Sequence, residues 1–457
     1  MDNNTKKYTV SFITLGCRVN QYESDSIAAI LEDMGFTVVS AGEKADVTII
    51  NTCTVTAESD RKSRQMIRRA VASGSAVIVA GCYSQAAPAD AAKIDGVHYI
   101  CGNGRKSEIP GIALALAEGK LPDIRDNVTD ISAEGYDPLV LRKPRRARSY
   151  IKIEDGCENQ CAYCIIPSAR GKVRSKPMEE ILEEAAHLAS VGSHEIILTG
   201  IETASYGRDF TAVRKTDDGA VLTVRKPYGE ALAELLEAVD RIPGVWRIGL
   251  GSLEPTVMRE DIVGRLASLS HLLPHFHFSI QSGSTDILHR MRRRYTADMI
   301  SSVLARVRKA IPGVTFSADV IVGFPGETDE EFQETAALIE KERFLHLHLF
   351  PYSKRAGTEA AVMPGQIPEE IKKKRLKILE DIQQKIRREM LEDYVREHTD
   401  SPVYVLVEKW ENGISNGHTE HYVEVDIPTD MDLTGDCLAV FLTETDGIIC
   451  KGVPAVL

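Results

Sequence analysis

Three cysteines stand close together, with no histidine among them, in the stretch EDGCENQCAYCIIPSARG (154–171). Cys157, Cys161 and Cys164 have the spacing C-x3-C-x2-C. A structural zinc ion takes four protein ligands, and no nearby histidine or cysteine completes such a set. Thiolates also hold four-iron clusters, in which three cysteines leave one iron open to bind a small molecule. The spacing therefore favours an open iron–sulfur cluster.

Length and composition indicate a globular protein of a reducing compartment. The chain has 457 residues, 43% of them hydrophobic and 27% charged, which predicts two or three domains. It has no apolar segment of signal-peptide length at its start, and no run of the roughly 18 apolar residues that a membrane span needs, so we expect a cytoplasmic protein with no membrane partner. Nine cysteines in such a setting indicate ligand or redox roles rather than a disulfide framework.

Short β-rich runs in the first hundred residues each end in a small residue and a cysteine, and helix-like stretches separate them. The cysteines are Cys17, Cys53, Cys82 and Cys101. This βαβα order predicts a parallel sheet, whose carboxyl ends would bring the cysteines to one edge. Alternatively, cysteine is a small apolar residue that suits a buried strand end. That alternative explains one of these cysteines easily and three or four of them poorly.

A second β/α series follows a proline-rich basic segment, 138–148, which we interpret as a linker. Six strand–helix units in about 220 residues predict a barrel that is incomplete beside the eight-stranded form. The expected strands read SYIKIED, HEIILTG, WRIGLGS, FHFSIQS, FSADVIVGFPG and LHLHLFPYS. Active sites of such barrels lie at the carboxyl ends of the strands, and the three-cysteine stretch follows the first strand.

The last ninety residues predict a charged helix, 369–397, and a small antiparallel barrel with the strand-like runs PVYVLVEKW, HYVEVDIP, CLAVFLTET and GIICKGVPAVL. Small barrels of this kind often contact single-stranded or loop RNA, but many only cap a core or mediate assembly. Cys437 and Cys450 fall in this barrel, and we expect them to be core thiols.

Basic runs interrupt an otherwise acidic chain of net charge −12. They are RKPRRAR (142–148), MRRRY (291–295) and KKKR (372–375). Local basic patches can bind phosphate even on an acidic protein. Taken singly, each run is more typical of a solvated face or a linker.

Taken together, the motifs resemble a known family. C-x3-C-x2-C at the end of the first strand of a partial barrel resembles the radical S-adenosylmethionine (SAM) enzymes. With GCRVNQYES, NTCTVT, GCYSQ, GFPGET and FPYSKRAGT it resembles their methylthiotransferase branch over nearly the whole chain. The resemblance implies an α/β protein in three domains: an N-terminal parallel-sheet domain (1–135), a partial (βα)6 TIM-like barrel (136–370), and a linker helix with a TRAM-like β-barrel (371–457).

The same resemblance implies two four-iron clusters and a SAM site. Cys157, Cys161 and Cys164 would hold the radical SAM cluster, and Cys17, Cys53 and Cys82 a second cluster that carries the sulfur. Cys101 matches no ligand position of the family, but it ends a strand near the same edge, so an exchange of ligands remains open. The implied SAM contacts are Tyr163 beside the adenine, then Thr199, Gly200, Ser279, Gln281, Asp319 and Ile321. For each of these residues outside the cysteine stretch, ordinary packing of the barrel core is an equally good explanation.

The activity implied is replacement of an unactivated C–H by C–S–CH3, which acid–base catalysis cannot easily achieve. Within the family, GCRVNQYES, MRRRYT and VIVGFPGETDEEF look most like the branch that modifies threonylcarbamoyladenosine next to the anticodon of tRNA. Other branches modify isopentenyl-type adenosine in tRNA or an aspartate in a ribosomal protein. The implied partners are the anticodon stem-loop, a low-potential electron donor and a sulfur source.

The expected substrate carries a carboxylate, so an arginine is expected near the barrel mouth. Arg247, Arg294 and Arg355 are the candidates. The terminal barrel departs from the usual TRAM pattern at GHTEHYVEV, including His418 and His421. Two other classes explain part of the sequence: an iron–sulfur electron carrier would explain the cysteines, and a zinc-organised RNA-binding protein would explain the cysteines and the basic runs.

Overall fold

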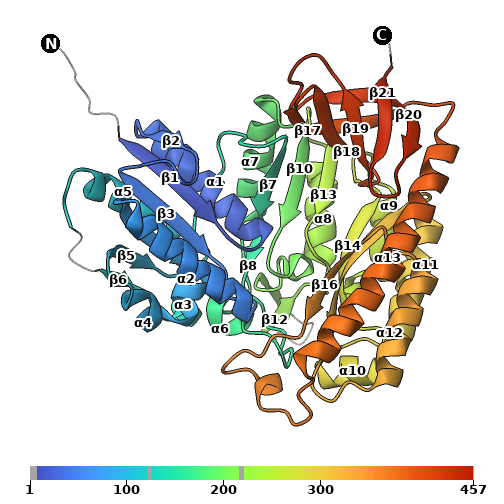
Figure 1. Ribbon diagram of the computed structural model, residues 1–457, viewed down its shortest axis with the longest axis horizontal. Coiled ribbons are helices and arrows are strands. Elements are labelled where there is room, and N and C mark those ends of the chain that lie inside the picture. Colours follow the sequence, from blue (N-terminus) through green and yellow to red (C-terminus); the bar gives the residue numbers. More distant parts are fainter. Residues whose placement is uncertain (1–7, 122–124, 216–220, 456–457) are drawn as a thin grey trace.

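The computed structural model describes residues 8–121, 125–215 and 221–455, and for residues 212–215 and 221–223 it describes the backbone alone. It contains a parallel sheet with helices, an open βα barrel and a small closed β-barrel (Figure 1). This mixed α/β architecture confirms the fold class predicted from the sequence. The domain boundaries at 135/136 and 370/371 remain predictions.

The N-terminal sheet is parallel throughout and has the order β2-β1-β3-β4-β5-β6. Its strands are β1 (Thr9–Thr14), β2 (Thr37–Val39), β3 (Val47–Thr52), β4 (Ala76–Gly81), β5 (Val97–Cys101) and β6 (Asp126–Asn127). The helices are α1 (Arg18–Asp33), α2 (Ala57–Ala72), α3 (Cys82–Ala86), α4 (Pro88–Ala92) and α5 (Ile109–Ala117). The central strand β3 is buried along its whole length, as expected of a parallel strand covered on both faces.

Helix α1 connects this sheet to the rest of the molecule. It packs against β7 of the barrel as well as against its own sheet, and its buried residues include polar side chains such as Asn20 and Glu23. Buried polar groups need partners, so an amphipathic pattern alone does not explain this helix. The partners lie in the barrel, as described below.

The central region is a barrel of six parallel strands that does not close. Two three-stranded sheets, β13-β10-β7 and β14-β15-β16, meet through a parallel bridge between Leu253 and Phe278. The strands are β7 (Arg148–Lys152), β10 (Glu195–Thr199), β13 (Arg247–Leu250), β14 (His275–Gln281), β15 (Thr315–Val322) and β16 (His346–Pro351). All six coincide with the runs expected from the sequence, although β7, β14 and β15 each begin one residue earlier than expected.

Helices cover the outside of this barrel. They are α7 (Met178–Ser190), α8 (Glu230–Val239), α9 (Glu260–Ala267), α10 (Thr285–Arg290), α11 (Ala297–Ala310) and α12 (Asp329–Glu342). At the start of helix α12, Thr328 and Glu331 form a reciprocal capping box. An antiparallel hairpin of β11 (Thr211–Lys215) and β12 (Val221–Arg225) was not predicted from the sequence.

A long helix and a closed five-stranded barrel complete the chain. Helix α13 (Glu369–Glu397) runs along β16 and leads to the barrel (Figure 1). Its strands are β17 (Val403–Glu411), β18 (Ile414–Thr419), β19 (Glu424–Pro428), β20 (Cys437–Thr445) and β21 (Cys450–Pro454). The sequence reading missed β18, and it was wrong to expect an entirely antiparallel barrel, because β19 pairs with β21 in parallel.

The segment 138–148 is not a free linker. Leu139 and Leu141 are buried, the hydroxyl of Tyr22 donates to the Leu139 carbonyl at 2.5 Å, and the Leu141 amide donates to Glu184 at 2.6 Å. Its proline and arginine content suggested a linker, but its two leucines anchor it against α1 and α7. No helix in the described parts of the chain has the length and apolarity to cross a bilayer.

Candidate active site

Cys157, Cys161 and Cys164 lie together in the loop between β8 (Glu154–Asp155) and α6 (Ile166–Arg170) and line one pocket of about 710 Å³. The loop is held by backbone hydrogen bonds from Cys157 to Gly171 at 3.0 Å and from Ala162 to Met291 at 3.0 Å. Both partners lie outside the three-cysteine segment. The surrounding chain therefore holds the loop so that all three thiols reach the same space.

Hydrogen-bond donors surround these sulfur atoms. The Ile166 amide donates to Cys164 Sγ at 3.4 Å, and Arg293 Nη1 donates to Cys161 Sγ at 3.3 Å. Burial raises the pKa of the Cys157 and Cys164 thiols, that of Cys164 to about 12. A bound metal takes up thiolates, and N–H donors stabilise the negative charge that the sulfur atoms keep.

The thiol chemistry fits an iron–sulfur cluster. All nine cysteines are free, so none of these thiols is tied up in a disulfide. Within the described residues, no three histidine, cysteine or acidic side chains converge on a single-ion site. A four-iron cluster is bound through separate irons, so it does not require that convergence.

The other predicted cysteine ligands come from three neighbouring strands of the N-terminal sheet. Cys17 caps α1 shortly after β1, Cys53 follows β3, and Cys82 follows β4. Gly16, at φ +104°, lets the chain approach closely, because a Cβ there would lie 3.2 Å from Cys53 Sγ. Burial raises the pKa of Cys53 to about 11, and the neighbouring thiols of Cys82 and Cys17 add to that shift. The three thiols thus lie near enough to influence one another.

Cys101 has different surroundings. It is fully buried, and its thiol faces the backbone carbonyls of Gly102 at 3.3 Å and Arg105 at 3.4 Å. It packs in the main hydrophobic core. These contacts are those of a buried core thiol, and they favour Cys82 over Cys101 as the third ligand. Cys450 is likewise buried, whereas Cys437 is partly exposed.

Arg170 joins the two cysteine groups. It lies six residues after Cys164, yet its Nε donates to Cys82 Sγ at 3.3 Å. Its Nη1 contacts Glu23 at 2.9 Å and Asp155 at 3.0 Å. The side chain is fully buried, so its charge is neutralised by these carboxylates rather than by water.

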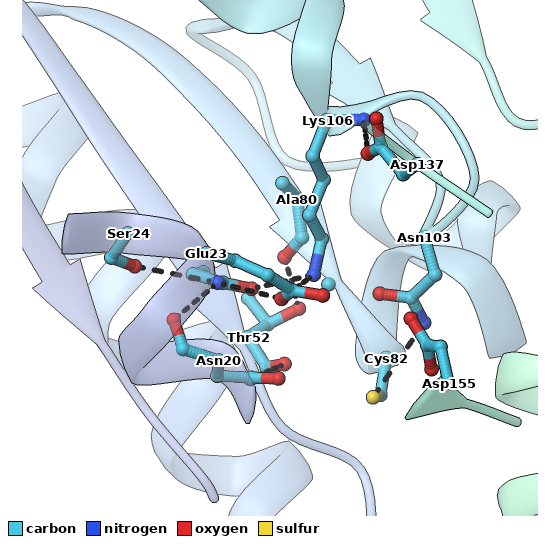
Figure 2. Close-up of polar contacts among 12 residues, drawn as sticks. Asn20, Glu23, Ser24, Thr52, Ala80, Cys82, Asn103, Lys106, Asp137 and Asp155 are labelled. Carbon is cyan, nitrogen blue, oxygen red and sulfur yellow. Dashed lines mark hydrogen bonds and ion pairs between the residues drawn. The ribbon is translucent and has the colours of Figure 1, made fainter. Parts of the chain in front are cut away.

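Figure 2 shows the buried polar network around Cys82. The amide of Asn103 points at the sulfur, 3.6 Å away, and the ammonium of Lys106 contacts Glu23. Burial alone would raise the pKa of Glu23, but Arg170, Lys106 and Lys152 hold it well below its usual value. The interface between the sheet and the barrel is therefore a set of paired buried charges, which explains why α1 buries polar residues.

A pocket of about 490 Å³ lies where the N-terminal sheet meets the mouth of the barrel. Cys17 and Arg18 line it from the sheet side. The predicted SAM contacts that line it are Tyr163, Thr199, Gly200, Gln281, Asp319 and Ile321. Ser279 is not in the lining, and its Oγ donates to Asp319 at 3.4 Å. The fold thus gathers six residues from the ends of β10, β14 and β15 and from the cysteine loop around one cavity, next to a cysteine of the other group.

The strand ends around this pocket carry buried acids. A Cβ at Gly200 would lie 2.1 Å from Glu154 Oε1, so glycine is required there. Glu154 Oε2 is buried and has no hydrogen-bond partner within the described chain. Burial, together with the neighbouring Glu254, raises the pKa of Glu202 to about 7. Buried acids with an unused acceptor suit a cationic ligand group, such as the ammonium of an amino acid.

The three arginines predicted to bind a substrate carboxylate lie elsewhere. Arg247 donates to the Tyr404 carbonyl at 2.6 Å and faces Glu195, whereas Arg355 pairs with Asp60 at 2.8 Å. Arg294 is exposed. The sequence reading missed Arg170 and Arg293 as sulfur contacts, although one lies in the cysteine stretch and the other in the run MRRRY.

His418 and His421 lie at an internal contact. His418 Nε2 is 3.2 Å from Glu195 at the start of β10, and the His421 carbonyl accepts from Thr315 at 2.6 Å. His418 is buried. The departure from the usual pattern at GHTEHYVEV therefore serves docking of the small barrel onto the βα barrel.

The basic runs mostly form ion pairs within the protein. Lys143, Arg145 and Arg146 pair with acids of α1, and Arg148 pairs with Glu408 at 2.6 Å. In the other runs, Arg292 and Arg375 are paired as well. The main role of these residues is to link elements of the fold through ion pairs, rather than to form a single phosphate-binding face.

Comparison with known proteins matches two family models. Residues 151–339 match the Radical SAM superfamily, and residues 9–102 match the Uncharacterized protein family UPF0004. The chain is also similar in fold to the radical S-adenosylmethionine methyltransferase TsrM from Kitasatospora setae, solved with cobalamin and a 4Fe-4S cluster. The TM-score is 0.54 at 15% identity, covering 78% of this chain and 77% of that one.

Two curated relatives align over most of the chain. The Threonylcarbamoyladenosine tRNA methylthiotransferase MtaB of Bacillus subtilis is 38% identical and covers 94% of this chain and 93% of its own. The tRNA-2-methylthio-N(6)-dimethylallyladenosine synthase of Moorella thermoacetica is 34% identical and covers 97% and 98%. The chain belongs to the radical SAM methylthiotransferase family and is an enzyme of the MtaB type.

Proposed function

We propose that this enzyme methylthiolates tRNA, converting N6-threonylcarbamoyladenosine next to the anticodon to its 2-methylthio derivative. The observation that carries the proposal is the 490 Å³ pocket, which is lined at once by Cys17 of one cysteine group and by residues beside the other. Inserting sulfur at an unactivated carbon requires radical generation and a sulfur carrier to meet at one substrate. The name of the Bacillus subtilis relative supports the choice of nucleoside.

The two cysteine groups have different proposed roles. Cys157, Cys161 and Cys164 would hold the 4Fe-4S cluster that the radical SAM family implies, with SAM beside it. When bound, the cluster supplies the electron that cleaves SAM into methionine and a carbon radical able to take hydrogen from the base. Cys17, Cys53 and Cys82 would hold a second cluster that carries the sulfur. Arg170 and Asn103 hold Cys82 in position.

Within the pocket, each lining residue has a proposed role toward SAM. The ring of Tyr163 offers a face for the adenine. Gly200 leaves room for the buried Glu154, and the acids Glu154 and Glu202 would take the ammonium group. Gln281, at φ +66° after a bulge in β14, and Asp319 offer polar groups to the ribose, and Ile321 offers apolar contact. Ser279 would act through Asp319.

The remaining partners follow from this chemistry. A low-potential donor must supply the electrons and a sulfur source must supply the inserted sulfur, because the side chains of the protein provide neither. A tRNA substrate also implies a cytoplasmic location. The division into domains at 1–135, 136–370 and 371–457 would assign the second cluster to the first, SAM to the second, and part of the RNA contact to the third.

Nucleoside mass spectrometry tests the proposal. The reconstituted enzyme is incubated without oxygen with SAM, sulfide and dithionite, and with tRNA that carries either threonylcarbamoyladenosine or dimethylallyladenosine. We expect a methylthio adduct on the threonylcarbamoyl nucleoside. An adduct on the dimethylallyl nucleoside alone would move the enzyme to the branch of the Moorella relative. SAM cleavage without any nucleoside product would refute a tRNA substrate.

A further inference from the structure

The pocket at the barrel mouth continues into the barrel. A second cavity of about 310 Å³ shares Arg18, His277 and His348 with it. This inner cavity reaches His275 and His346, at the starts of β14 and β16, and Tyr422 of the small barrel also lines it. The shared residues therefore line a lumen that leads inward from the pocket assigned to SAM.

Most of the lumen's ionisable groups already have partners or are neutral. Arg148 pairs with Glu408 at 2.6 Å, and Arg387 faces Glu424 at 3.5 Å. Burial and the neighbouring imidazoles lower the pKa of His348 and lower that of His346 to about 4. These two histidines are therefore uncharged at neutral pH.

Arg18 differs from the other lumen cations. Its guanidinium contacts the Leu250 carbonyl at 3.5 Å and the Tyr422 hydroxyl at 3.4 Å, and both are long for hydrogen bonds. No carboxylate in residues 8–121, 125–215 and 221–455 forms an ion pair with it. It is also the first residue of α1, whose first turn has no acidic side chain, so the helix dipole adds to the positive potential. A half-buried cation with weak partners, facing a cavity, is poised for an anion.

We propose that Arg18 binds the threonyl carboxylate of the substrate nucleoside, which extends from the barrel mouth into this lumen. A guanidinium matches a carboxylate through two parallel hydrogen bonds. The neighbouring groups His277, His348 and Ser317 offer polar partners to the hydroxyl and urea of the same substituent. A dimethylallyl group would leave the charge of Arg18 without a carboxylate, which disfavours it.

The position of Arg18 also suits the reaction. It directly follows Cys17, so a carboxylate held there is next to the cysteine group that would carry the sulfur. This inference rests on the proposed function, because it assumes a threonylcarbamoyl substrate. Arg18 thus takes the place of Arg247, Arg294 and Arg355 as the predicted ligand of the substrate carboxylate. In the sequence it stood out only as part of the motif GCRVNQYES.

A pair of RNAs that differ only at the carboxylate provides the test. Anticodon stem-loops carrying threonylcarbamoyladenosine or its neutral carboxamide analogue are titrated with the enzyme, and fluorescence anisotropy gives both dissociation constants. We expect the wild-type enzyme to bind the acid about 10- to 100-fold more tightly, the range for hydrogen bonds to a charged group. Arg18→Gln should bind both RNAs alike, and Arg18→Lys should keep part of the preference.

Arg294→Gln is the matched control. It removes an exposed arginine of the barrel, so it should leave the ratio of acid to amide unchanged even if both RNAs bind more weakly. A wild-type enzyme with no preference for the acid, or an Arg18→Gln enzyme that keeps it, overturns the role of Arg18. Should Arg18→Gln fail to fold, the wild-type and Arg18→Lys ratios decide.

The same RNAs separate this inference from the proposed function. Methylthiolation of the threonylcarbamoyl RNA by the wild-type enzyme, with no loss of preference in Arg18→Gln, leaves the function standing and refutes the inference. Methylthiolation of a dimethylallyl RNA alone refutes both.

Discussion

The two cysteine groups are assembled in different ways. Cys157, Cys161 and Cys164 lie in one loop around one pocket, and backbone hydrogen bonds to Gly171 and Met291 hold that loop. Cys17, Cys53 and Cys82 follow three separate strands, and they meet only because β1, β3 and β4 are neighbours in the sheet. The first site is a property of a short segment, whereas the second requires the whole sheet and, through Arg170, the barrel. This difference predicts that the second site is the more sensitive to changes far from its ligands.

The largest expected effect separates the two groups by function. Cys161→Ala should abolish SAM cleavage, because it removes a ligand of the cluster that reacts with SAM. Cys53→Ala should leave SAM cleavage in place and abolish methylthiolation. Chromatography of the 5′-deoxyadenosine formed and mass spectrometry of the nucleosides measure the two outcomes. Cys437→Ala, in the small barrel, is the control and should change neither. Full methylthiolation by Cys53→Ala, with Cys101 intact, would show that the second group is wrongly assigned.

Next in size is the loss of the link between the groups. Arg170→Met leaves Glu23 and Asp155 buried without their shared cation, and removing one partner of a buried pair costs about 3–5 kcal/mol. Calorimetry should show unfolding at a lower temperature, and the iron bound by the N-terminal group should fall more than that bound by the loop. Arg61→Met, which breaks an exposed pair with Glu58, is the control and should change neither. Equal iron loss from both groups would contradict the asymmetry.

The smallest effect concerns Cys101. Its thiol is buried against carbonyls, so Cys101→Ala should cost about 1 kcal/mol of stability, as small core truncations do, and leave bound iron unchanged. Cys82→Ala is the matched variant and should lose iron from the second group. Iron and acid-labile sulfide assays compare the two proteins. Iron loss from Cys101→Ala equal to that from Cys82→Ala would make Cys101 a ligand.

Features that depend on local spacing were predictable. The strands of the open barrel and the bounds of α13 follow from hydrophobic periodicity and terminal residues. Strand β18 was not predicted because ISNGHT lacks the alternation of apolar and polar residues that is typical of a strand. The parallel pairing of β19 with β21 was not predicted because it depends on closure of the small barrel. Burial of Leu139 and Leu141 was not predicted because prolines and arginines surround them in the sequence.

The sequence by itself determined the three-cysteine loop, the α/β succession and the family, because each depends on residue types at short spacings. Only the tertiary structure decided which distant residues share a site. It brought Arg170 to Cys82, committed Arg247 and Arg355 to internal partners, and left Arg18 facing a cavity with no ion pair to a carboxylate of the described residues. Whether a charge is paired depends on sheet order and domain packing, and no spacing along the chain records those.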